Sequence, residues 1–177
     1  VDPDPDVLVS PVDGTLGSFG AIEEGILWQI KGKTYNLNEL LDDDDDVVTF
    51  QDGSFITFYL SPRDYHRVHA PLSGQVKAAT LIPGSLMPVF PLAVEKVDKL
   101  FARNERIITY IDTAQMGRVA VVMVGAMLVG RMSMAFDSEL RSNIRGQLRH
   151  KKAYEPSHLL RKGMELGMFE MGSSVVL

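Results

Sequence analysis

The sequence contains no cysteine among its 177 residues. This absence excludes a disulfide framework, a thiolate nucleophile and any metal site built from thiolates. Zinc ribbons and thioredoxin-like redox chemistry are therefore ruled out. Covalent catalysis by this chain would have to use another kind of side chain.

A long apolar run is also missing. The longest, residues 119–130, falls well short of the ~20 residues that a membrane-spanning helix needs. We therefore expect any membrane role of these residues to be peripheral. The acidic, proline-rich start and the apolar end of the sequence suggest a fragment of a longer precursor.

Clustered positive charge is scarce, since the formal net charge is −5. Nucleic-acid binding is disfavoured because neutralising phosphates requires grouped Lys and Arg side chains. One locally basic stretch remains and has two interpretations, a solvated helix face or, less favoured, a surface for anionic lipid headgroups. Its basic residues are Arg141, Arg145, Arg149, Lys151 and Lys152.

Short β-prone segments dominate what is present. Residues 26–30, 55–60, 107–111 and 118–124 are rich in aromatic and β-branched side chains and predict strands. Only residues 35–41, with Asn36 or Asn38 as the cap, predict a short helix. We expect one α+β domain over residues 1–177, with many short, mostly antiparallel strands in a compact barrel or sandwich.

Three segments are harder to assign. The acidic run 42–46 predicts a solvated loop. Residues 81–94 hold three prolines and predict an apolar loop that either covers the core or contacts lipid. Residues 137–162 are polar and show no clear period.

One motif occurs twice, sixty residues apart. Residues 10–16 and 70–76 share the pattern small-Pro-apolar-x-Gly-x-aliphatic. In each copy the proline begins a turn between two short strands, and the glycine allows the backbone conformation of that turn. The repeat predicts two half-units related by a pseudo-twofold axis, as in lipoyl-like barrels.

Four polar side chains are candidates for chemistry. His66 and His69 could bind a metal, satisfy local hydrogen bonds or act as acid and base, although an isolated HxxH is a weak metal signal. Asp13 lies in a predicted turn just after a strand, and turn geometry alone could explain it. A serine nucleophile needs a base and an orienting acceptor, and Asp13, a histidine and Ser173 would form that set. The sequence has no G-x-S-x-G elbow, which argues against an α/β-hydrolase.

Five segments in order resemble those of the phosphatidylserine decarboxylases, the pyruvoyl-dependent and membrane-associated bacterial type. The resemblance extends over nearly the whole chain, from residue 7 to 177. The segments are Val-Ser-Pro-Val-Asp-Gly at 9–14, Ser-Pro-Arg-Asp-Tyr-His-Arg-Val-His at 61–69, Phe-Ala-Arg-Asn-Glu-Arg at 101–106, Val-Gly-Ala-Met-Leu-Val-Gly at 124–130 and Lys-Gly-Met-Glu-Leu-Gly-Met-Phe-Glu-Met-Gly-Ser-Ser at 162–174.

This resemblance implies a proenzyme that cleaves itself between Gly172 and Ser173. The β subunit would be residues 1–172, and Ser173 would become the pyruvoyl group that begins the α subunit. Asp13, His69 and Ser173 match the self-cleavage triad, and His66 matches the histidine used in decarboxylation. Because the histidine pair has no evident third ligand in the sequence, we expect no metal site.

The implied reaction converts phosphatidylserine to phosphatidylethanolamine and CO2 through a Schiff base between the serine amine and the pyruvoyl ketone. The resemblance also implies a homodimer, bound peripherally to the cytoplasmic face of the bacterial inner membrane. The N-terminal membrane helices and most of the α subunit of such proteins lie outside this sequence.

Two other functions stay open. A lipoyl-like β-barrel module that binds without catalysis would explain the repeated motif, but not the histidine pair or the Gly-Ser step. A pyruvoyl decarboxylase acting on another amino-acid substrate would explain both. The apolar segment 81–94 favours a lipid substrate.

Overall fold

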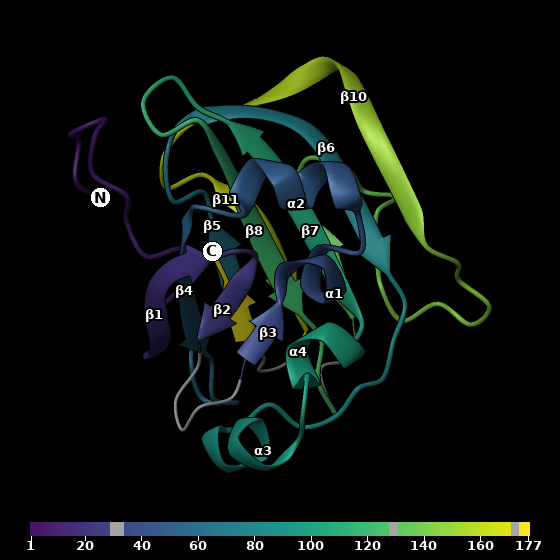
Figure 1. Cartoon of the computed structure of the whole chain (residues 1–177). Helices are drawn as coiled ribbons and strands as arrows, with labels where there is room; N and C mark the ends of the chain where they lie inside the picture. The colour runs from purple at the N-terminus through teal and green to yellow at the C-terminus, as the bar shows by residue number, and fades with distance from the viewer. Residues whose placement is uncertain (29–33, 128–130, 171–173) are drawn as a thin grey trace.

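The computed structural model describes residues 1–28, 34–127, 131–170 and 174–177, which form twelve strands and four short helices (Figure 1). The strands are β1 (Thr15–Glu23), β2 (Ile26–Trp28), β3 (Thr34–Asn36), β4 (Ser54–Tyr59), β5 (Arg67–His69), β6 (Gly74–Ile82), β7 (Arg106–Asp112), β8 (Arg118–Val124), β9 (Met132–Met134), β10 (His150–Leu160), β11 (Glu165–Phe169) and β12 (Ser174–Val176). The helices are α1 (Leu37–Leu41), α2 (Asp44–Phe50), α3 (Pro91–Lys96) and α4 (Leu100–Arg103).

Two antiparallel sheets organise the described residues. Nine strands pair in the order β10-β6-β7-β8-β12-β4-β1-β2-β3, and three pair in the order β5-β11-β9. Helices α1, α2 and α4 lie over one face of the large sheet (Figure 1). This arrangement confirms the predicted β-rich α+β class with few helices. It also confirms the predicted short helix and its cap Asn36, although the helix covers only residues 37–41, because Tyr35 and Asn36 belong to β3.

The core lies on both faces of β7 and β8. Ile108 and Tyr110 face the helices, whereas Ile107 and Met123 face the small sheet, and all four are buried. The small sheet approaches closely at Gly167, where an added Cβ would lie 3.3 Å from Sδ of Met123. Each fully buried aliphatic side chain contributes roughly 1.5–3 kcal/mol, so this two-sided burial holds the central strands in register.

The repeated motif pairs with itself. The amide of Val9 donates to the carbonyl of Pro71 at 3.0 Å, and the amide of His69 donates to the carbonyl of Pro11 at 2.8 Å. These two hydrogen bonds exchange places under the sixty-residue offset. The predicted pseudo-twofold relation is therefore confirmed at these segments.

The two glycines of the motif meet the same constraint. A Cβ on Gly14 would lie 2.7 Å from the carbonyl oxygen of Tyr59, and a Cβ on Gly74 would lie 2.6 Å from that of Asp112. Both contacts are with backbone, which cannot move cheaply. Glycine is therefore required where β1 starts beside β4 and where β6 starts beside β7.

The loop predicted for residues 42–46 is wrong. Asp43 caps α2 by accepting a hydrogen bond from the Asp46 amide at 3.4 Å, and the next acids form its first turn, where the helix dipole favours negative charge. Asp46 is buried and lies 2.9 Å from Nζ of Lys151. Arg149 pairs with Asp42 at 2.7 Å. Basic side chains at the start of β10 and directly before it thus neutralise a run that was expected to be solvated.

Two further segments differ from their predicted form. Residues 81–94 are an apolar loop only in part, because β6 extends to Ile82 and α3 begins at Pro91. Residues 137–162 contain the eleven-residue strand β10, which the sequence did not predict. Its register with β6 shifts between Ala153 and His158, and this irregularity removes the period-two pattern.

Candidate active site

The segments that hold Asp13, the two histidines and Ser174 come together at one end of the large sheet. Tyr59, the last residue of β4, pairs with Thr15 of β1 on one side and with Ser174 of β12 on the other. The segment that precedes β1 and the one that follows β4 therefore emerge beside Ser174. Gly172 and Ser173 themselves lie outside the described residues, so their predicted roles stay predictions.

His69 is the most tightly placed of these side chains. Its Nδ1 atom lies 2.8 Å from the carbonyl oxygen of Gly163, and its Nε2 atom lies 3.2 Å from the hydroxyl oxygen of Tyr65. A carbonyl oxygen can only accept, so Nδ1 carries the proton of the neutral ring. Nε2 then holds the lone pair and accepts from Tyr65. The base nitrogen is thus defined by the backbone of Gly163.

The ring of Tyr65 also restrains His69 by stacking. The two ring centroids lie 5.7 Å apart with an interplanar angle of 14°. Tyr65 itself is exposed, so its hydroxyl can leave Nε2 without disturbing the core. Stacking therefore fixes the orientation of the imidazole, and the hydrogen bond from Tyr65 to Nε2 can break when the base is needed.

His66 lies on the approach to the predicted cleavage point. Its Nε2 atom lies 3.2 Å from the carbonyl oxygen of Ser61, which can only accept, so Nε2 donates. Its own carbonyl accepts from the amide of Phe169, the last residue of β11, at 2.9 Å. Phe169 stands four positions before Ser173 in the sequence. His66 is thus anchored to the segment that leads into the Gly-Ser step.

Asp13 is close to His69 along the backbone but is not its hydrogen-bond partner. The amide of His69 bonds the carbonyl of Pro11, two residues before Asp13. Asp13 is exposed, and in the described parts of the chain no hydrogen bond joins its carboxylate to the imidazole. The structure gives the orienting acceptor at Nδ1 to Gly163.

A small pocket of about 100 Å³ adjoins Ser174. Ser174 is only 1% exposed and is one of the residues that line it. Residues of β1 and β4 face residues from the region of α3 and α4 across this space, and both sides combine polar and apolar side chains. The lining residues include Ser18, Thr57, Phe58 and Tyr59 on one side and Val89, Val94, Glu95 and Phe101 on the other. The pocket has room for a small polar group beside Ser174, the residue that follows position 173.

The segment 101–106 forms the scaffold behind this pocket. The buried Asn104 side chain donates to the carbonyls of Met87 and Gly125 at 2.8 and 2.9 Å and accepts from the Met87 amide at 3.1 Å. The guanidinium of Arg106 donates to four backbone carbonyls, including that of Leu40 at 2.7 Å. Burial lowers the pKa of Arg106 to about 10, so it stays charged near neutral pH. These residues hold loops in place rather than meet a ligand.

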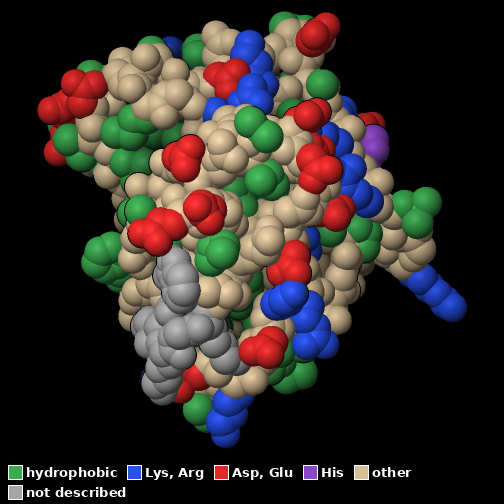
Figure 2. Space-filling view, viewed as in Figure 1, with side chains coloured by type: hydrophobic (Ala, Val, Ile, Leu, Met, Phe, Trp, Pro, Cys, Tyr) green, Lys and Arg blue, Asp and Glu red, His purple; other side chains and the backbone are tan. Residues whose placement is uncertain are grey.

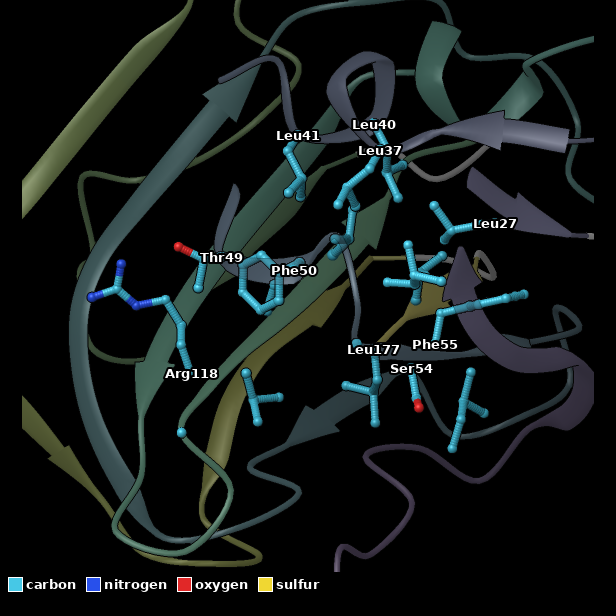
Figure 3. Close-up of a pocket in the computed structure, with 18 of the residues that line it drawn as sticks. Leu27, Leu37, Leu40, Leu41, Thr49, Phe50, Ser54, Phe55, Arg118 and Leu177 are labelled. Atoms are coloured by element: carbon cyan, nitrogen blue, oxygen red, sulfur yellow. The ribbon is translucent and has the colours of Figure 1, made fainter. Parts of the chain in front are cut away.

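A larger cavity of about 410 Å³ lies under α1 and α2 (Figure 3). Its walls are mostly apolar, and Leu27, Leu37, Leu40, Leu41, Phe50 and Phe55 point into it, with Thr49 and Arg118 at one side. Val176 and Leu177 place it at the opposite end of β12 from Ser174. Of the predicted site residues that the structure describes, Asp13, His66 and His69, none lines it.

Sequence reasoning missed three residues of the site. Tyr65 lies inside the histidine segment, and its spacing of four from His69 was the available signal. Gly163 lies 94 positions after His69, and its φ of +80° marks it as a turn glycine only once the fold is known. Ser174 follows the Gly-Ser step, and nothing in the sequence indicated that its side chain lines a pocket.

The described residues lack two features. They contain no group of three or more His, Asp and Glu side chains that could hold a metal ion. The helices that the structure describes are all too short or too polar to cross a membrane.

Known proteins match this chain along its whole length. A family model described as phosphatidylserine decarboxylase matches residues 1–177. The phosphatidylserine decarboxylase proenzyme of Brevibacillus brevis is 45% identical over 179 residues, covering all of this chain and 63% of the relative. Proenzymes of the same name from Azotobacter vinelandii and Marinobacter nauticus are 43% and 40% identical, and this chain spans 63% and 62% of them.

The chain thus spans less than two thirds of the length of these relatives. The match nevertheless includes the histidine segment, both copies of the repeated motif and the Gly-Ser step, since it omits no part of this chain. The chain belongs to the phosphatidylserine decarboxylase family.

Proposed function

We propose that this chain carries the self-processing centre of a pyruvoyl-dependent decarboxylase that converts phosphatidylserine to phosphatidylethanolamine and CO2. One observation carries the proposal: Tyr59 pairs with both Thr15 and Ser174, which brings the Asp13 turn, the histidine segment and the residue after Ser173 to one sheet end. Family membership supplies the substrate class. In this proposal residues 1–172 are the β subunit and Ser173 begins the α subunit.

Self-cleavage requires a base, a nucleophile and an open carbonyl. Nε2 of His69 takes the proton of the Ser173 hydroxyl, whose oxygen attacks the carbonyl carbon of Gly172. The peptide C–N bond breaks, an ester forms, and the amino group of Ser173 is released. Gly172 carries no side chain that would shield the carbonyl. Asp13 stabilises the imidazolium that forms, and Gly163 keeps its Nδ1 proton in place.

The ester then leaves by β-elimination. Loss of the Cα proton of Ser173 expels the Gly172 carboxylate and leaves dehydroalanine, which water converts to a pyruvoyl group and ammonia. The fit of such a group is supported by the pocket of about 100 Å³ beside Ser174. When present, the group supplies an electron sink for decarboxylation.

The side chains around the pocket have separate tasks in this proposal. His66 delivers the proton that replaces CO2 on the substrate carbon, because a general acid must act there and an imidazole titrates near neutral pH. Ser174 presents its hydroxyl group to the headgroup, while Oγ1 of Thr57 accepts from the Ser18 amide and donates to the Ser18 carbonyl, which holds the wall of the pocket. Val89 and Phe101 exclude water from the reacting centre.

The partners follow from the same assignment. We propose peripheral attachment to the cytoplasmic face of the bacterial inner membrane, α and β subunits cut from one precursor, and a homodimer.

A pyruvoyl decarboxylase with another amino-acid substrate is the alternative that the small size of the pocket beside Ser174 favours. A non-catalytic lipoyl-like module is favoured only by the pseudo-twofold motif.

A product assay tests the proposal. The purified protein is incubated with dispersed phosphatidylserine, and separately with free serine, while CO2 and the amine product are measured. We expect CO2 and phosphatidylethanolamine from the lipid. CO2 from free serine alone would favour the alternative substrate, and no CO2 from either would refute decarboxylation.

A further inference from the structure

One loop projects from the body of the molecule with an unusual surface. We name residues 141–149, which precede β10, the arm; it extends at the right of Figure 1. Leu148 is 80% exposed and Ile144 is 48% exposed. Figure 2 shows hydrophobic and Lys or Arg side chains together on this projection. Large apolar side chains at such a tip call for an explanation because water does not favour them.

The arm is held rigidly at both ends. At its start, Ser142 accepts from the Met132 amide at 2.9 Å, and the Asn143 amide donates to the buried Glu105 carboxylate at 3.0 Å. At its end, Arg149 pairs with Asp42 at 2.7 Å. The exposed tip is therefore a built feature rather than a frayed loop.

The tip itself is closed by its own hydrogen bonds. The amide of Gln147 donates to the carbonyl of Ile144 at 3.1 Å, and its side chain donates to the carbonyl of Arg141 at 2.7 Å. Gly146 adopts a φ of +79°, which the turn requires. The turn holds Ile144 and Leu148 facing outward. Because its backbone is already ordered, burying these side chains in another surface would cost little backbone entropy.

The charge of the arm has one sign in a chain whose net charge is −5. It contains three arginines and no acidic residue. Arg149 is paired, but Arg141 and Arg145 are exposed, and neither has a carboxylate partner among the described residues. Apolar side chains flanked by unpaired positive charge complement an anionic lipid surface, where the former enter the headgroup layer and the latter meet phosphates.

We propose that the arm is a docking element for an anionic lipid bilayer, with Ile144 and Leu148 inserting and Arg141 and Arg145 at the headgroups. The proposal deepens the peripheral membrane attachment put forward above and rests on it. Exposed apolar side chains beside unpaired arginines fit the headgroup layer of an anionic bilayer. A second copy of this chain, whose net charge is also negative, is the other occupant that the experiments below distinguish.

The absence of cysteine makes a site-specific test direct. Leu148→Cys is labelled with nitrobenzoxadiazole and mixed with phosphatidylcholine vesicles, with or without phosphatidylglycerol. We expect a blue-shifted, stronger emission only with the anionic lipid, reversed by added salt. The matched control is Phe19→Cys on β1, which is 68% exposed and should show no shift. No shift at position 148, or an equal shift at position 19, would overturn the proposal.

Charge and apolar contributions are separated by further variants. Arg145→Gln should weaken vesicle binding about fivefold, the effect of one basic side chain near an anionic surface. Ile144→Ser should weaken it by a similar factor without changing the salt dependence. If the emission shifts with rising protein concentration in the absence of vesicles, the arm contacts a second copy of the chain. That result would refute docking on a bilayer.

The design also keeps this proposal apart from the proposed reaction. Phosphatidylglycerol has no amino acid to decarboxylate, so docking is measured without turnover. Loss of docking in the arm variants, with unchanged CO2 release from detergent-dispersed phosphatidylserine, is the expected result. Docking that persists in a protein without decarboxylase activity would refute the reaction and leave the arm as a lipid contact.

Discussion

The hydroxyl oxygen of Tyr65 lies 3.2 Å from Nε2 of His69, while Gly163 occupies the other ring nitrogen. The nitrogen expected to act as a base is therefore already engaged before it meets Ser173. Because one neutral hydrogen bond contributes about 1 kcal/mol, Tyr65 restrains the base without blocking it.

Removing the Tyr65 hydroxyl should accelerate self-cleavage. Tyr65→Phe keeps the stacked ring but frees Nε2, so we expect the cleavage rate to rise up to about fivefold. Tyr65→Ala also loses the stack, which lets the imidazole rotate, and should cleave more slowly than the wild type. Band intensities on a denaturing gel over time give both rates. A Phe variant slower than the wild type would mean that the hydroxyl assists the base.

The two histidines should separate processing from decarboxylation. His66→Ala leaves His69 and its partners intact, so we expect cleavage at a normal rate with no CO2 released from phosphatidylserine. Gel analysis and CO2 measurement on one preparation give both results. An uncleaved His66→Ala protein would show that the assignment of tasks to the two histidines is wrong.

Gly14 should be intolerant of a side chain. Gly14→Ala places Cβ 2.7 Å from the Tyr59 carbonyl oxygen and should lower the free energy of unfolding by about 1–3 kcal/mol. Gly20→Ala on the same strand is the control, because its nearest neighbour, Cε1 of Phe55, is at 3.6 Å. Urea unfolding compares them, and equal effects would contradict the crowding at Gly14.

Asp137 should contribute a pH-dependent part of the stability. Burial raises its pKa, but hydrogen bonds from Lys152 and Tyr154 outweigh burial and hold the pKa below its ordinary value. The stabilisation is therefore fully present above the unfolded pKa of about 3.9 and is lost as the pH falls below it. Asp137→Asn should cost about 1.5–3 kcal/mol near neutral pH and progressively less in acid.

The control for Asp137 is a neighbouring exposed acid. Glu139 lies 3.7 Å from Nζ of Lys152 and is almost fully exposed, so Glu139→Gln should change stability little at any pH. Urea unfolding at several pH values measures both variants. A deficit of Asp137→Asn that stays constant down to the lowest pH would refute the lowered pKa.

Local sequence patterns were sufficient where the structure is local. The strands around residues 55–60, 107–111 and 118–124 are continuous apolar runs because both sheet faces are covered. Asn36 caps its helix within the same segment. The repeated motif revealed its pseudo-twofold relation because each copy must enter a strand past a crowding carbonyl.

Distant partners explain what the sequence could not predict. The acids at 42–46 cap and begin helix α2 rather than form a solvated loop, because Arg149 and Lys151, about a hundred positions later, neutralise them. Strand β10 carries a register shift that breaks its alternation. His69 finds its acceptor at Gly163, on a loop after β10, and no spacing rule connects those two positions.

The central claim is that the chain cuts itself between Gly172 and Ser173. Intact mass of the purified protein measures this directly, with Asp13→Ala, His69→Ala and Ser173→Ala as variants that should stay whole. We predict two fragments that meet at this bond, the second beginning with a pyruvoyl group that reacts with hydroxylamine. A single unmodified chain under native conditions would contradict the account.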